Sequence, residues 1–253
     1  MPLSDQIYYF ETKNGKAGAM PVILVHGAGG SLLHWPLSIR RPGTRKVYAL
    51  DLPGHGRSGG LGEQSVRNYA GIVQDWMIEI HVSRAVIIGH AMGCAIALSM
   101  ALHHPDYVAG IILLGAGAKF LVDPGLLSQI SSPAGFPNAV NLITKRSFSP
   151  GTGPRITEQV REQLLQTRPS VLHGDYLACR LFDISEPFPP ITHPTSIICG
   201  ELDDITPVRY SEFLAENIPG AELTIVPGAG HMVMLEQPDL VAQTIEDFIE
   251  RIE

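Results

Sequence analysis

The sequence predicts an α/β fold in which a mainly parallel sheet carries helices on both faces. Short runs rich in β-branched residues alternate with segments of helical periodicity, the pattern of repeated strand–helix units. Glycine (26 residues) and proline (20 residues) are frequent, which suits tight turns between short elements. Only 17% of the 253 residues are charged, below the roughly 25% of an average domain, as expected when strands are buried on both faces.

Seven segments have the length and composition of strands, and four have the periodicity of helices. The expected strands are 7–11, 21–25, 46–50, 85–88, 110–114, 196–199 and 222–226. The expected helices are 66–80, 92–104, 208–216 and 238–252. The last helix begins with Pro238 in its first turn, where a missing N–H is tolerated. Its apolar residues at helical spacing are Leu240, Val241, Ile245, Phe248 and Ile252.

Residues 120–191 break the alternation, because they show helical patterns and Pro–Gly punctuation but no strand pattern. A structureless loop of this length is implausible inside a compact domain. We therefore expect a helical cap at 120–191, inserted into a core formed by 1–119 and 192–253 and lying over the strand ends. The segment holds six basic and six acidic residues. This balance gives no general support for an acidic carrier protein as partner and leaves open whether one is involved.

Composition excludes several classes of function. The net charge of −7 argues against nucleic acid as a partner. No apolar run reaches the ~20 residues of a membrane span, and the start lacks a basic segment followed by an apolar one, so we expect neither membrane association nor a signal peptide. Cys94, Cys179 and Cys199 are odd in number and widely spaced, which favours reduced thiols in a cytoplasmic protein. The histidines show no metal-ligand spacing, and no metal or cofactor is expected.

The motifs that carry chemistry stand where the expected strands end, the edge at which parallel sheets bind ligands. The 21–25 strand runs into a small-residue loop, His26-Gly-Ala-Gly-Gly30. The 85–88 strand runs into Gly89-His-Ala-Met-Gly93 and straight into a helix. The 196–199 strand leads to Gly200-Glu-Leu-Asp-Asp204, and the last strand leads to Gly228-Ala-Gly-His231.

These motifs, in this order and over essentially the whole chain, resemble the α/β-hydrolase superfamily in its compact, helical-capped, carboxylesterase-like form. That family's nucleophile elbow reads Gly-x-Ser-x-Gly, and here Ala91 occupies the serine position. The resemblance implies that His231 is the general base and that Asp203 orients it, with Asp204 the rival by adjacency alone. It also implies an oxyanion hole formed by the backbone N–H groups of Ala28 and Met92.

Other candidates are weaker. Cys94 lies one turn past Ala91, and a small buried hydrophobe is a better interpretation of it than a replacement nucleophile. The remaining histidines are expected to be structural or exposed; they are His34, His55, His81, His90, His103, His104, His173 and His193. The turn from Asp51 to Ser58 matches a family turn and is expected to be structural.

The alanine at position 91 leaves two explanations open: an engineered Ser→Ala variant, or a natural non-catalytic binding protein on a hydrolase scaffold. We favour the first, because every other catalytic feature matches the family pattern. The expected parent is a hydrolase of small or medium carboxylic esters with an apolar acyl or aryl group, acting through an acyl-enzyme. The chain itself should be nearly inactive, since loss of such a serine costs about 10⁶ in kcat. A carbon–carbon bond hydrolase or lactonase on the same triad is the alternative enzyme. The sequence does not identify the oligomeric state or the cap residues that touch substrate.

Overall fold

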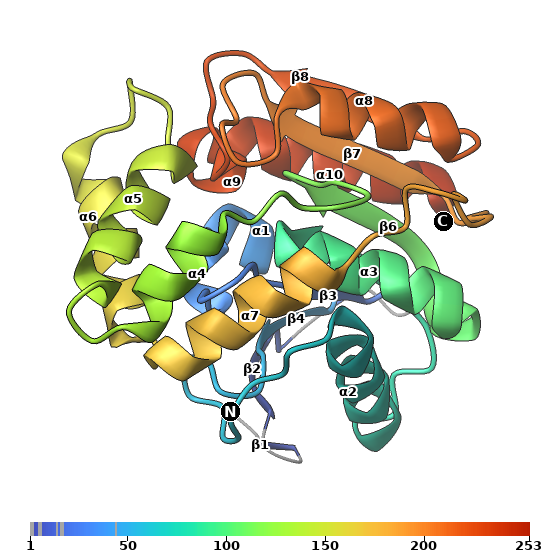
Figure 1. Ribbon diagram of the computed structural model, residues 1–253. Helices are drawn as coiled ribbons and strands as arrows, with labels where there is room; N and C mark the ends of the chain where they lie inside the picture. The colour runs from blue at the N-terminus through green and yellow to red at the C-terminus, as the bar shows by residue number, and fades with distance from the viewer. Residues whose placement is uncertain (1–2, 5–6, 14, 16–17, 44) are drawn as a thin grey trace.

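In the computed structural model of the protein, which describes residues 3–4, 7–13, 15, 18–43 and 45–253, the strands form one sheet of order β1-β2-β4-β3-β5-β6-β7-β8 (Figure 1). β1 and β2 run antiparallel to their neighbours, and the pairs from β4 to β8 are parallel. The strands are β1 (Leu3–Ser4), β2 (Ile7–Glu11), β3 (Val22–Val25), β4 (Val47–Asp51), β5 (Ala85–His90), β6 (Val108–Leu114), β7 (Thr195–Gly200) and β8 (Glu222–Val226).

The predicted α/β fold is confirmed, and all seven expected strands are present, with ends that differ from the predicted ones by at most two residues. The two-residue strand β1 was not expected, because so short a segment carries no pattern. Part of the amino-terminal segment in which we expect no signal peptide, residues 1–2 and 5–6, lies outside the described residues. Among the described helices, none has the length and apolar character needed to cross a membrane.

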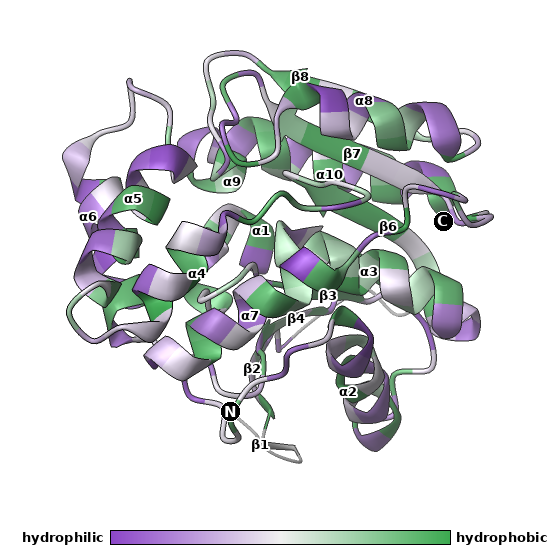
Figure 2. Cartoon of the chain, viewed as in Figure 1, coloured by the Kyte–Doolittle hydropathy of each residue, from purple (hydrophilic) through white to green (hydrophobic). Residues whose placement is uncertain are grey.

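Helices cover both faces of the sheet, and alternate strand residues point to opposite faces. In β3, Ile23 and Val25 pack in one apolar cluster, which includes residues of α2, α3 and α8. Val22 and Leu24 pack in the other, which includes residues of α1 and α10. Burial on both faces explains why the strands are almost continuously apolar (Figure 2). These helices are α1 (Leu37–Arg40), α2 (Val66–Glu79), α3 (Met92–His103), α8 (Val208–Asn217), α9 (Val233–Glu236) and α10 (Pro238–Ile252).

The predicted bounds of α10 are confirmed, but its apolar face was predicted too broadly. Val241, Ile245 and Phe248 are buried, and Ile249 completes the buried stripe. Leu240, which the helical spacing grouped with these residues, is 45% exposed and lies off the buried stripe. It adjoins Val241 in sequence and is turned about 100° away from it around the helix, which takes it off the stripe.

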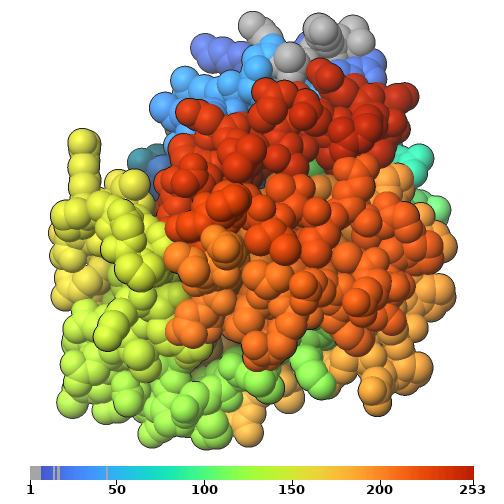
Figure 3. Space-filling view, turned by 90° about the horizontal axis from the view of Figure 1, so that it is seen from above, coloured from blue at the N-terminus to red at the C-terminus, as the bar shows by residue number. Residues whose placement is uncertain are grey.

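Between β6 and β7 the chain forms four helices: α4 (Pro124–Ser131), α5 (Phe136–Ser147), α6 (Pro154–Gln166) and α7 (Pro169–Leu181). We call residues 120–191 the helical insertion. All of it is described, and it contains no strand. An isolated bridge pairs Lys119, which directly precedes the insertion, with Asp183 near its end. In Figure 3 the yellow-green atoms of the insertion lie against the orange-red atoms of the core that follows it in the chain.

The sharp turn from β5 into α3 depends on two glycines. Ala91, at its apex, has φ +51° and ψ −112°, a strained conformation for a residue with a side chain. A Cβ on Gly89 would overlap the carbonyl of Gly93, and one on Gly93 would overlap the carbonyl of Val25. Gly89 therefore lets α3 fold back closely on β5, and Gly93 lets the turn pack against β3. The turn holds residue 91 at the carboxyl end of β5.

We expect Gly93→Ala to lower the free energy of unfolding by about 3 kcal/mol, because the added methyl group meets rigid backbone. Gly71→Ala is the matched control: Gly71 lies within α2, and nothing lies within 4 Å of a Cβ built there. This variant should be more stable by about 1 kcal/mol, the helix-propensity difference. Urea unfolding measures both. Equal changes in the two variants would show that the β5–α3 turn relaxes freely.

Candidate active site

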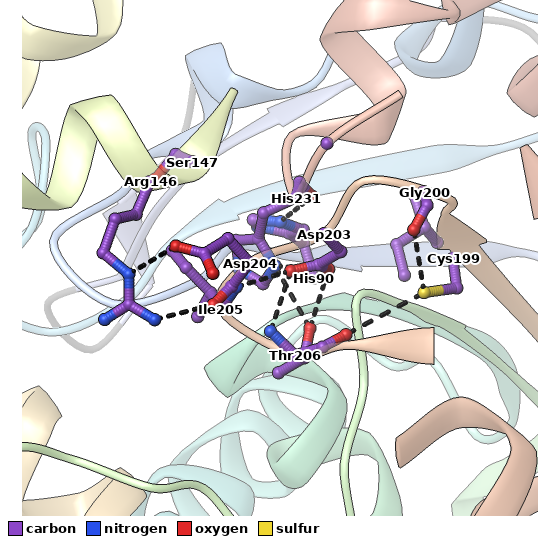
Figure 4. A network of polar contacts seen from close by, with 12 residues as sticks. His90, Arg146, Ser147, Cys199, Gly200, Asp203, Asp204, Ile205, Thr206 and His231 are labelled. Carbon is purple, nitrogen blue, oxygen red and sulfur yellow. Dashed lines mark hydrogen bonds and ion pairs between the residues drawn. The ribbon is translucent and has the colours of Figure 1, made fainter. Parts of the chain in front are cut away.

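His231 and Asp203 lie side by side at the carboxyl ends of β8 and β7. His231 Nδ1 is 2.8 Å from Asp203 Oδ2, and both residues are buried. The backbone N–H groups of Ile205 and Thr206 donate to Asp203 Oδ1, and the Thr206 hydroxyl donates to Oδ2 (Figure 4). Burial raises the pKa of Asp203, but His231 and these donors lower it by more, so the pKa of this carboxyl lies below its usual range. The carboxylate is thus ionised and fixed in orientation.

Asp204, the neighbouring acid, points to a different partner. Its carboxylate accepts from Arg146 Nε at 2.8 Å, and its carbonyl accepts from Arg146 Nη2 at 2.6 Å (Figure 4). Both side chains are largely exposed. Of the two adjacent acids, Asp203 contacts His231, and Asp204 joins the core to helix α5 of the insertion.

Ala91, Ala28, Met92 and His231 line one pocket. Met92 is the first residue of α3, so its N–H has no acceptor in a preceding turn of helix. Among the hydrogen bonds of the described ranges, none uses the N–H of Ala28. The structure therefore brings the positions of Ala28, Ala91, Met92 and His231 together at one pocket, with Asp203 in contact with His231.

The walls of the pocket are mostly apolar and come mainly from the insertion. Among the apolar residues are Phe120, Leu121, Val122, Leu126, Leu142, Ile143, Val160 and Leu164. Two charged residues at the wall are already engaged, since Asp123 caps the start of α4 and Arg146 binds Asp204. The pocket therefore suits an apolar ligand with one polar centre near residue 91.

His34 and His90 were expected to be structural or exposed, and the structure places both at the pocket wall. His90 Nε2 donates to the carbonyl of His231 at 3.1 Å, while His90 Nδ1 has no partner in the described part of the chain. The ring of His90 lies 4.7 Å from that of His231. The position of His90 inside the elbow motif could have predicted that it lies at the pocket. For His34, the sequence offers only its place shortly after the glycine loop.

We expect the protein to lose stability as the pH falls from about 6.5 to 4. Burial lowers the pKa of His26, His34 and His90, that of His34 to about 4. Below pH 6.5 an unfolded chain binds protons at these rings while the folded chain does not, so the free energy of unfolding falls. His34 alone accounts for up to about 3 kcal/mol. Burial lowers the pKa of His55 too, but Asp175 raises it by more, so His55 acts in the opposite direction.

Urea unfolding at about pH 7, 6 and 5 measures this loss, and His34→Gln should show a smaller one. A stability that stays constant down to pH 5 in the parent would contradict the assignment of three neutral buried rings.

Cys94, which was expected to be a small buried hydrophobe, lies outside the pocket lining. Cys94 is fully buried, and its thiol faces the carbonyls of Gly89 and Leu114, both at 3.2 Å; burial raises its pKa far above the ordinary thiol value. Cys94 is therefore a packed residue of the core and is not placed as a nucleophile.

Apart from the few residues left undescribed, the chain shows no cluster of three or more His, Cys, Asp or Glu side chains that could hold a metal ion.

The parallel sheet and the buried His–Asp pair at its carboxyl edge are features of the α/β-hydrolase class of proteins, and the comparison with protein families assigns the chain to the same class. Residues 22–244 match the model of the Alpha/beta hydrolase family, and the chain belongs to that family. The resemblance predicted from the motifs is thereby confirmed.

Among its relatives are esterases. The chain is 30% identical to a solved thermophilic esterase, with a TM-score of 0.84 over 97% of this chain and 94% of that one. It is 26% identical over 250 residues to the pimeloyl-[acyl-carrier protein] methyl ester esterase of Yersinia enterocolitica, covering 92% of this chain and 95% of the relative. It is 29% identical to the dihydrolipoyllysine-residue acetyltransferase component of the acetoin cleaving system of Pseudomonas putida, of which it spans 65%.

Proposed function

We propose that this site is that of a serine-type carboxylesterase for small or medium esters with an apolar acyl or aryl group, and that Ala91 stands where the active form has serine. The observation that carries the proposal is that His231, paired with Asp203, lines one apolar pocket together with Ala91. Ala28 and Met92, the proposed oxyanion donors, line the same pocket. The esterases among the relatives support the same reaction class.

With serine at position 91, the reaction has two steps. The serine oxygen attacks the ester carbonyl while His231 takes its proton, and the oxyanion is held by the N–H groups of Ala28 and Met92. The alcohol leaves with the proton from His231, and an acyl-serine remains. Water, deprotonated by His231, then attacks this ester and releases the carboxylic acid. Asp203 stays ionised throughout and stabilises the imidazolium.

In the chain as it stands, the binding elements remain but the nucleophile is missing. His231 has no hydroxyl to deprotonate, and turnover should be about 10⁶ below that of the serine form. Alanine deletes one oxygen and keeps the strained turn. We infer that Ala91 is a substitution in a catalytic parent; a natural gene with an alanine codon at position 91 would overturn this and favour a non-catalytic binding protein.

The helical insertion is proposed to act as a cap that selects the substrate. It supplies most of the apolar wall, and its charges are balanced and partly paired, as in Arg146–Asp204 and Arg161–Glu158. This balance gives no general support for a substrate carried by an acidic protein, and the apolar wall suits a small-molecule ester. The three cysteines are buried free thiols, which supports a reducing, cytoplasmic setting.

The test is Ala91→Ser assayed on nitrophenyl esters of graded chain length, with fluorophosphonate labelling mapped to residue 91. The esterase proposal expects rapid turnover of some esters and labelling only in the serine form. Turnover restricted to a lactone or to a vinylogous diketone would favour the alternative hydrolases. Silence in every assay, with binding of an apolar carboxylate retained, would favour the non-catalytic protein.

A further inference from the structure

The loop that carries Ala28 is held by the helical insertion. The N–H of Gly29 donates to Asp175 Oδ2 at 2.8 Å, and the carbonyl of Gly29 accepts from Thr167 Oγ1 at 3.0 Å. Gly29 has φ +65°, and a Cβ there would lie 2.5 Å from the Leu172 side chain. The Gly29 N–H belongs to the peptide unit that joins it to Ala28, so its bond to Asp175 restricts the orientation of Ala28.

Asp175, on α7, is a fully buried carboxylate with three donors. Its Oδ1 accepts from the Tyr69 hydroxyl at 2.7 Å. Its Oδ2 accepts from His55 Nε2 at 2.7 Å as well as from Gly29. A buried carboxyl group needs such partners, and here all three donors belong to the core. The insertion is therefore fastened to the core by this buried side chain.

His55 completes an ion pair with Asp175. Its Nδ1 lies 3.1 Å from the carbonyl of Pro53, so both ring nitrogens face oxygen acceptors, the arrangement of a doubly protonated ring. Burial lowers the pKa of His55, but the Asp175 carboxylate, helped by Asp51, raises it above its ordinary value. Neighbouring imidazole rings disfavour a positive charge on His55. One of them is His26, whose ring centroid lies 4.8 Å from that of His55.

We propose that Asp175 is a positioning residue for the oxyanion hole: from the helical insertion it fixes the Gly29 N–H and thereby the direction of the Ala28 N–H. The insertion then contributes to transition-state stabilisation as well as to substrate choice. The inference rests on the proposed function, because it takes Ala28 as an oxyanion donor.

The first experiment measures hydrogen exchange at the Gly29 amide in the chain as it stands and in Asp175→Asn. An amide side chain offers one acceptor oxygen instead of two and no charge, so the three donors can no longer all be satisfied. Exchange at Gly29 should rise at least about tenfold, while exchange in the central strand β3 stays unchanged. In the same variant the pKa of His55, followed by NMR, should fall.

The second experiment adds Asp175→Asn to the Ala91→Ser protein. We expect kcat to fall about 10- to 100-fold with KM within about threefold, because a misdirected donor weakens binding of the transition state only. Tyr69→Phe is the matched control: it removes a hydrogen bond from the same carboxylate, but at the oxygen that does not bind Gly29. It should lower the melting temperature and keep kcat. Thr167→Val, which removes the bond to the Gly29 carbonyl, should lower kcat less and serves if Asp175→Asn does not fold.

The outcomes separate this inference from the proposed function. If Ala91→Ser turns over esters and neither Asp175→Asn nor Thr167→Val changes kcat or Gly29 exchange, the positioning role is wrong and the esterase proposal stands. If Tyr69→Phe loses as much kcat as Asp175→Asn, the cluster is only structural. If Ala91→Ser is inactive on every ester while Gly29 exchange rises in Asp175→Asn, the esterase proposal fails and the loop contact alone remains.

Discussion

In the Ala91→Ser protein, replacing His231 with alanine is expected to lower kcat about 10⁶-fold and to leave KM nearly unchanged. His231 lines the pocket with Ala91 and contacts the buried carboxylate of Asp203. Under the proposed mechanism it is the base in the attack and the acid for the leaving alcohol. Without it, serine must lose its proton to water. Steady-state kinetics on the best nitrophenyl ester measures the loss.

Two controls make this prediction specific. His103→Ala removes an exposed histidine at the end of α3 and should leave kcat within about twofold. In the Ala91 chain, His231→Ala should change the residual rate hardly at all, because nucleophile and base act as a unit. A loss of less than tenfold in the serine form would mean that another group takes the proton.

The elbow was predicted from the resemblance of the motifs and their order to a known family, and the structure shows its local cause. A strand that turns directly into a helix at residue 91 needs small residues on both sides, and Gly89 and Gly93 show this need in the sequence itself. The same holds for Asp203 and His231, which each follow a strand within a few residues. Chain order and strand ends suffice to place such groups at one edge of a parallel sheet.

The choice between Asp203 and Asp204 was harder, because the two are adjacent and alike. What separates them is three-dimensional: Asp203 turns inward to the Thr206 and Ile205 amides, and Asp204 turns outward to Arg146 of the insertion. Family resemblance favoured the first, but no spacing rule distinguishes the two side chains.

The cluster around Asp175 was beyond sequence reasoning. Its partners lie 120 residues away at His55 and 146 away at Gly29, and their contacts depend on how the insertion settles on the core. Helical periodicity predicts that 120–191 is helical but carries no information on which polar residue of α7 points inward. His55 alone has no local pattern that separates an ion-paired ring from an exposed one.

Asp203→Asn in the Ala91→Ser protein is expected to lower kcat about 10⁴-fold. Under the proposed mechanism, the carboxylate orients His231 and offsets the charge that the ring gains during attack. An amide at this position has no charge, and its NH₂ group can donate to Nδ1 and turn the ring into the wrong tautomer. Because the pKa of Asp203 lies below its usual range, the parent keeps this charge throughout neutral and mildly acidic assays.

The neighbouring residue provides the matched control. Asp204→Asn makes the same chemical change at an exposed side chain whose partner is Arg146, and kcat should stay within about twofold. Thr206→Val removes the hydroxyl donor to Asp203 Oδ2 but leaves the charge of Asp203 and both backbone donors in place. The loss of kcat in Thr206→Val should therefore lie between the losses in Asp203→Asn and Asp204→Asn. If Asp203→Asn and Asp204→Asn lowered kcat equally, the charge beside the pocket would matter only at long range. A loss confined to Asp203 instead requires the direct contact with His231, which is what the 2.8 Å geometry predicts.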